Sequence, residues 1–144
     1  MHFQLHTAYG IHTPKMHLLL GKIYWAIQNN SPLQMTQGTQ LREYWHATDI
    51  ARFVKSRNWE DTFARITSVS SGHPIELREL ALAIFDHFSA RDLLYLASIP
   101  DQPNETYNRD MFQQTDNAAD FMRDPIRGLI DYFENYLKGD ICAN

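Results

Sequence analysis

The sequence has little cysteine, little excess charge and no long apolar run. Its 144 residues include one cysteine, Cys142, which excludes an intramolecular disulfide and a thiolate metal cluster. This usage fits a reducing compartment, so we expect a cytoplasmic protein. The formal net charge of −4 argues against non-specific nucleic-acid binding. No apolar run approaches the roughly 18 residues of a membrane span, and we expect neither a membrane segment nor a signal peptide.

Several motifs of catalysis and metal binding are also absent. The seven histidines do not form the His-Glu-x-x-His pattern of zinc hydrolases, and we expect no metal site. No serine lies in Gly-x-Ser-x-Gly, and no Gly-x-x-x-x-Gly-Lys phosphate loop occurs. Cys142 stands at the C-terminal tail without a nearby histidine. We therefore expect no nucleophilic serine or cysteine.

What the chain does contain is a distinctive segment that begins at Gly38. A glycine turn leads into an extended piece with Arg42 and several aromatic residues, and Asp49 then falls in the first turn of an amphipathic helix. An arginine held on a rigid edge can bind a phosphate, because its planar guanidinium donates two parallel hydrogen bonds. The alternative interpretation is a surface arginine paired with Glu43 or Asp49.

Hydrophobic periodicity along the rest of the chain predicts a mixed α/β fold. Thr13-Pro14 is a typical helix start, since threonine caps a helix and proline is tolerated in its first turn. Asp124-Pro125 has the same pattern. Strands are expected at 3–8, 33–36, 63–69 and 92–97, and helices at 14–27, 47–57, 77–88, 115–121 and 124–137. Residues 99–117 read as a loop with two prolines and no apolar period.

The order of these motifs resembles the C-terminal half of extended short-chain dehydrogenases, the NAD-dependent nucleotide-sugar epimerases and dehydratases. Three segments carry the resemblance. They are Gly38-x-Gln40-x-Arg42 with the helix that Asp49 opens, Leu5-His6-Thr7-Ala8-Tyr9-Gly10, and Ser70-Ser71-Gly72-His73-Pro74-Ile75 before Leu77-Arg78-Glu79-Leu80. The resemblance implies the last strands of a Rossmann sheet plus a small α/β substrate-binding subdomain. The first strand departs from the family pattern, because His6, Ala8 and Ile11 stand near the family's arginine, asparagine and proline.

The same resemblance implies a set of substrate-binding residues. Arg42 corresponds to the family arginine that binds the nucleotide diphosphate. Gln40 lies two residues earlier, on the same face of an extended segment, and could hold the sugar or the arginine. The helix that contains Leu19 would form one wall of the nucleotide pocket. Arg109 would close over the nucleotide from the 99–117 loop, and its alternative is a solvated loop arginine.

The resemblance covers nearly all of this chain but less than half of a family member. The family's Gly-rich dinucleotide fingerprint does not occur here. Its Tyr-x-x-x-Lys pair is also absent, because no lysine follows a tyrosine at that spacing. We therefore expect no catalytic residue and no cofactor-binding residue in this chain, although NAD(P) is implied for the full-length family.

Two functions follow from the sequence. In the first, residues 1–144 are one domain or fragment: the substrate-binding portion of such an epimerase or dehydratase, without its N-terminal dinucleotide-binding part and inactive alone. It would be a truncated gene product, a fragment or one part of a split enzyme. Its partners would be a nucleotide sugar and either the missing N-terminal domain or a second copy. The alternative is a non-catalytic α/β binding protein or subunit on the same scaffold. A third interpretation, a helical adaptor, would require almost no strand.

Overall fold

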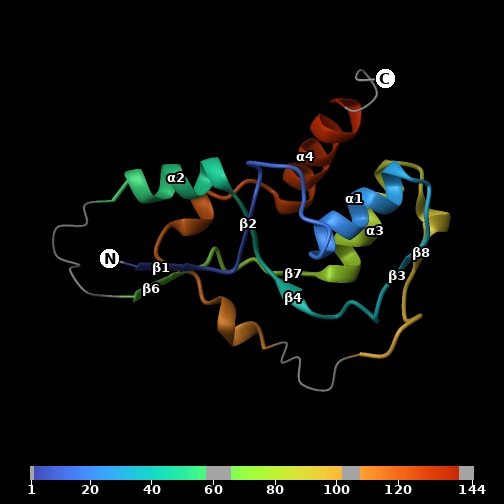
Figure 1. The fold of residues 1–144 in the computed structure, drawn as a ribbon. Helices are drawn as coiled ribbons and strands as arrows, with labels where there is room; N and C mark the ends of the chain where they lie inside the picture. Colours follow the sequence, from blue (N-terminus) through green and yellow to red (C-terminus); the bar gives the residue numbers. More distant parts are fainter. Residues whose placement is uncertain (1, 58–65, 102–107, 140–144) are drawn as a thin grey trace.

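The computed structural model describes residues 2–57, 66–101 and 108–139. Helices and short strands alternate along it (Figure 1). In chain order they are β1 (His2–Leu5), β2 (Thr7–Tyr9), α1 (Leu19–Gln28), β3 (Leu33–Gln34), β4 (Leu41–Arg42), β5 (Tyr44–His46), α2 (Ala47–Lys55), β6 (Ile66–Val69), β7 (Ile75–Glu76), α3 (Leu77–His87), β8 (Leu94–Tyr95) and α4 (Pro125–Gly139). Three short 3₁₀ turns, at Arg91–Leu93, Arg109–Phe112 and Ala118–Asp120, complete the described elements. No helix among the described residues is both long and apolar enough to cross a membrane.

The strands pair in twos. β1 pairs with β6, β2 with β5 and β3 with β8, all in parallel, whereas β4 and β7 are antiparallel. This strand content confirms the mixed α/β prediction and excludes the helical adaptor. The predicted single strand at 3–8 is two strands, because the chain leaves β6 after Leu5 and joins β5 from Thr7 onward.

Two apolar cores organise the described residues. The larger one joins α1, α3 and α4, with fully buried Ile23, Leu80 and Phe133. The smaller one packs α2 against β1, β5 and β6 through Phe53, Trp45 and Val69. Figure 1 shows α2 lying along β1 and β6 while the other three helices gather on the opposite side of the molecule.

The first helix begins later than the sequence predicts. α1 starts at Leu19, after an N-cap without a side-chain hydrogen bond, so the predicted start at Thr13-Pro14 is wrong. The preceding loop folds back over the first turn of α1, where a side chain on Gly21 would overlap the Lys15 carbonyl. Glycine at this position lets the two backbones touch, and tertiary packing therefore overrides the local capping signal.

The remaining boundaries follow the sequence more closely. α4 begins at Pro125 as predicted, and the Asp124 carboxylate caps it by accepting a hydrogen bond from the Arg127 amide at 2.7 Å. The predicted strand at 92–97 shortens to β8, and the predicted helix at 115–121 is a single 3₁₀ turn. The start of the predicted strand at 63–69 and Cys142 lie outside the described residues.

Tyr9 packs tightly against α4. Its side chain is 6% exposed, and its hydroxyl is buried without a hydrogen-bond partner among the described residues. A side chain at Gly128 would overlap this hydroxyl. Burial raises the pKa of Tyr9 despite the nearby positive charge of Arg123. The phenol is therefore neutral, and glycine makes room for it in the helix.

The Tyr9–Gly128 contact predicts a coupled pair of substitutions. Tyr9→Phe should stabilise the fold by about 1 kcal/mol, because it removes an unsatisfied buried hydroxyl. Gly128→Ala should destabilise the wild type by about 1–2 kcal/mol through overpacking, and by less in the Tyr9→Phe background. Urea unfolding of the four proteins measures both effects. An identical loss on Gly128→Ala in both backgrounds would contradict the contact.

Candidate functional site

The segment that carries Arg42 is fixed by backbone hydrogen bonds to the start of α3. Gly38 has a φ of +69°, a left-handed conformation that glycine adopts without strain. Its carbonyl accepts a hydrogen bond from the Arg78 amide at 2.8 Å. β4 then runs antiparallel to β7, with Arg42 opposite Ile75. The predicted order of turn, extended piece and helix is confirmed, and Arg42 lies on a well-anchored backbone.

The next residue, Glu43, is completely buried and lies at the centre of a hydrogen-bond cluster. Its Oε1 accepts hydrogen bonds from the Ser70 hydroxyl (3.0 Å), the Ser71 amide (2.9 Å), the Ser71 hydroxyl (2.6 Å) and the His73 amide (3.2 Å). The indole of Trp45 donates to Oε2 at 3.1 Å. Five donors therefore satisfy this carboxylate, and no cation of the described residues pairs with it, so Glu43 is not the ion-pair partner of Arg42.

The other candidate partner, Asp49, is also completely buried and paired elsewhere. Its carboxylate accepts hydrogen bonds from Arg123 Nε at 2.7 Å and from Arg52 at 2.6 Å. Burial alone would raise the pKa of Asp49, but the hydrogen bonds from Arg123 and Arg52 outweigh burial and lower it. Asp49 lies in the first turn of α2, as predicted, and it also anchors this turn to the segment before α4.

Arg42 itself forms no ion pair with a carboxylate of the described residues. Its guanidinium donates to the Leu41 carbonyl at 2.7 Å, and the residue is partly exposed. It lies close to Tyr44, where burial raises the phenol pKa to about 12 even though the charge of Arg42 acts to lower it. The guanidinium therefore keeps unused donors for an anionic ligand.

The other predicted substrate-binding residues lie in three different parts of the chain. Gln40 lies just before β4 but is buried, and its amide donates to the Thr36 hydroxyl at 3.3 Å. Leu19 packs against the larger core, and Arg109 is exposed at the start of a 3₁₀ turn. Within the described ranges, no hydrogen bond or ion pair joins Arg109 to Arg42. The ligand roles of all four residues remain predictions.

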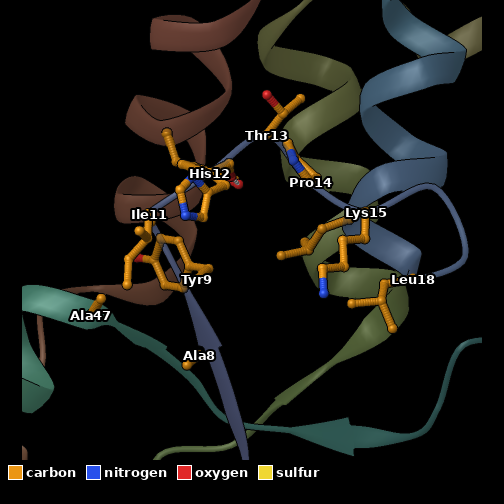
Figure 2. Close-up of a pocket in the computed structure, with 12 residues that line it drawn as sticks. Ala8, Tyr9, Ile11, His12, Thr13, Pro14, Lys15, Leu18 and Ala47 are labelled. Carbon is orange, nitrogen blue, oxygen red and sulfur yellow. Dashed lines mark hydrogen bonds between the residues drawn. The ribbon is translucent and has the colours of Figure 1, made fainter.

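A cavity of about 300 Å³ lies at the end of β2, where the sequence predicted a helix start. Its walls are Ala8 and Tyr9, the loop over residues 10–15, Leu18 and Leu20 of the α1 region, Ala47 of α2 and Tyr132 of α4. Figure 2 shows these side chains around the opening. None of the four predicted binding residues lines the cavity. Exposed Ile11, Met16 and Leu18 lie in this region. The predicted helix from Thr13-Pro14 covered Met16 and Leu18, so the sequence did not indicate a cavity there.

The described residues contain no cluster of histidine, cysteine, aspartate and glutamate that could hold a metal ion. The buried Asp49 carboxylate pairs with Arg123 beside His46. Burial and the charge of Arg123 lower the pKa of His46, and its Nδ1 accepts a hydrogen bond from the Thr48 amide at 3.2 Å. This imidazole therefore caps α2.

Comparison with known proteins gives a consistent fold. No protein-family model and no curated protein matches the chain. Among solved structures, UDP-N-acetylglucosamine 4-epimerase from Methanobrevibacter ruminantium, in complex with UDP-N-acetylmuramic acid, matches with a TM-score of 0.68 at 16% identity, over 95% of this chain and 46% of that chain. dTDP-glucose 4,6-dehydratase from Bacillus anthracis, in complex with NAD, matches with a TM-score of 0.61 at 12% identity, over 92% and 44%.

A third match is UDP-glucuronic acid 4-epimerase from Bacillus cereus, in complex with UDP-glucuronic acid and NAD. Its TM-score is 0.58 at 14% identity, and the match covers 93% of this chain and 45% of that chain. The chain therefore has the fold of the C-terminal part of an extended short-chain dehydrogenase, as the sequence predicted. It spans less than half the length of these structures, and at such low identity the likeness concerns the fold.

The buried carboxylate predicts a large effect of one isosteric substitution. Glu43→Gln should destabilise the fold by about 2–4 kcal/mol. The neutral amide loses the charge-assisted hydrogen bonds, and its NH2 group would face the N–H and O–H groups that now donate to the carboxylate. Glu79→Gln, on the exposed face of α3, is the matched control and should change stability by less than about 0.5 kcal/mol. Chemical denaturation measures both. Equal stability of the two variants would show that the Glu43 cluster contributes little.

Proposed function

We propose that this chain is the nucleotide-sugar-binding portion of an NAD-dependent nucleotide-sugar epimerase or dehydratase and is inactive alone. The observation that carries the proposal is Arg42. The two acids nearest to it in sequence are used elsewhere, while the arginine itself is partly exposed on an anchored strand. Its fork geometry suits a diphosphate. The nucleotide sugars and NAD in the named neighbours support this substrate class by analogy of fold.

The other predicted residues have supporting roles in this proposal. Gln40 is buried and holds the turn before Arg42 through Thr36. From this position two residues before Arg42, it holds the arginine or the sugar in this proposal. Leu19 contributes to the wall of the nucleotide pocket, and Arg109 closes over the nucleotide from its exposed turn. Asp49 does not touch the ligand, since a carboxylate beside a diphosphate would repel it.

The proposal includes a partner that completes the sheet. Parallel strands occur almost only in larger sheets covered on both faces, yet β1 and β6 pair with no third strand among the described residues. Gln4 of β1 and Ser68 of β6 are exposed, whereas Phe3 and Leu5 of β1 and Val69 of β6 belong to the smaller core that includes α2. A dinucleotide-binding domain or a second copy of this chain would extend this pair in the cytoplasm.

A second candidate function is a non-catalytic binding protein on the same scaffold. The absence of a Tyr-x-x-x-Lys pair from the 144 residues favours it. The DNA before the codon for Met1 distinguishes the two. A reading frame that encodes a Gly-rich strand–helix segment and this pair would favour the enzyme, and its absence would favour the binding protein.

Nucleotide-sugar binding should depend on Arg42. Titration of the chain with UDP-glucose in a calorimeter should give saturable binding, and Arg42→Ala should weaken it ten- to a hundredfold, as expected for about 1.5–3 kcal/mol from a charge-assisted bidentate contact. Arg42→Lys should recover part of the loss, because an ammonium cannot reproduce the fork. Thermal stability should barely change in either variant.

Arg127→Ala is the matched control for charge, because Arg127 is exposed and pairs with Asp131 on α4. It should bind UDP-glucose as the wild type does. Absence of UDP-glucose binding by the wild type would refute the site. Normal binding by an Arg42→Ala variant that melts several degrees lower would also refute it, and would show that Arg42 has a structural role.

The dinucleotide should behave differently from the nucleotide sugar. Because the chain has no Gly-rich fingerprint, NAD should give no saturable heat at concentrations where UDP-glucose binds. The same calorimetric titration measures this difference. Micromolar NAD binding by the purified chain would contradict the division of function that we propose.

A further inference from the structure

The cavity at the end of β2 is held open by three independent contacts. Gly10 turns the chain with a φ of +106°, where a side chain would overlap the His46 ring. The Tyr132 hydroxyl donates a hydrogen bond to the His12 carbonyl. The Lys15 carbonyl rests against α1 and accepts a hydrogen bond from the Leu18 amide at 3.0 Å. The loop over residues 10–15 is therefore fixed at its start, its middle and its end, and the cavity is preformed.

The walls of this cavity are mainly apolar. Ala8, Leu20, Ala47 and the buried ring of Tyr9 are among the residues that line it. Preformed pockets lined in this way, with a few polar groups, are typical of small-molecule sites.

Two apolar side chains stand exposed around the cavity. Ile11 is 67% exposed and Leu18 is 52% exposed, although both line the cavity. Clustered apolar exposure of this kind marks binding surfaces. A ligand with an apolar body would remove both side chains from water.

The residues that line the cavity carry positive charge only. Lys15 contributes an ammonium group, and no acidic residue is among the described residues that line the cavity. No carboxylate of the described part of the chain forms an ion pair with Lys15. Figure 2 shows the lysine side chain reaching beside Leu18 on the side of the opening opposite Tyr9 and Ala8. An anionic group at the mouth of the cavity would pair with this ammonium.

We infer that this cavity is a binding site for a small organic anion with an apolar body, such as an aromatic carboxylate. The apolar body enters between Tyr9 and Leu18, and the carboxylate pairs with Lys15. The site goes beyond the proposed function, because Arg42 does not line it and its ligand needs no nucleotide.

Naphthoate and its uncharged amide, naphthamide, are the probes. Ligand-observed NMR with the full chain should show saturable naphthoate binding and weaker naphthamide binding. Lys15→Met keeps the apolar stem of the side chain and should raise the Kd of naphthoate about five- to tenfold, with naphthamide unchanged. Ala8→Leu narrows the cavity and should weaken both probes. Circular dichroism checks that both variants fold.

Lys22→Met, on the exposed side of α1, is the matched control and should leave naphthoate binding unchanged, as should Arg42→Ala. Equal affinity for the two probes in the wild type would overturn the assignment, as would an equal loss in Lys15→Met and Lys22→Met. Loss of naphthoate binding in Arg42→Ala would overturn the location of the site. None of these results depends on whether the chain binds UDP-glucose.

Discussion

The hydrogen bonds to the buried Glu43 carboxylate are the interaction on which this structure depends most. A charge without a cation in a protein interior is strongly unfavourable unless donors surround it. Here the Ser70–His73 turn supplies four donors and Trp45 a fifth. The turn leads from β6 into β7, whereas Glu43 lies between β4 and β5. The Glu43 side chain therefore joins the β4–β5 segment to the turn between β6, which is part of the smaller core, and β7, which leads into α3.

The position of Glu43 also explains the state of Arg42. Successive residues of an extended segment point to opposite faces, so the inward carboxylate places its neighbour Arg42 on the outer side. Asp49 is drawn to Arg123 and Arg52 in the same way. The fold thus uses its two nearest acids for internal contacts and leaves a guanidinium partly exposed. The residues that stabilise the fold and the residue proposed to bind the ligand lie in one stretch of eight residues, from Arg42 to Asp49, and do not compete for the same charges.

Local signals in the sequence were enough to predict the mixed fold, the Gly38 turn and the start of α4 at Pro125. They were not enough where contacts with segments distant in the sequence determine the local structure. α1 begins at Leu19 because the loop before it packs onto Gly21, a contact that no capping rule contains. The burial of Glu43 depends on serines 27 and 28 positions away along the chain. The cavity beside β2 was missed for the same reason, since α4 supplies one of its walls.

The most direct measurement of the central claim is the NMR signal of the Arg42 side chain during a titration with UDP. Arginine Nε–H signals report on the hydrogen bonds of individual guanidinium groups. The account predicts that the Arg42 signal shifts and saturates with UDP, while the signal of Arg123, which is bound to Asp49, stays in place. An Arg42 signal that does not move at saturating UDP, or that moves no more than that of Arg123, would contradict the assignment of diphosphate binding to this chain.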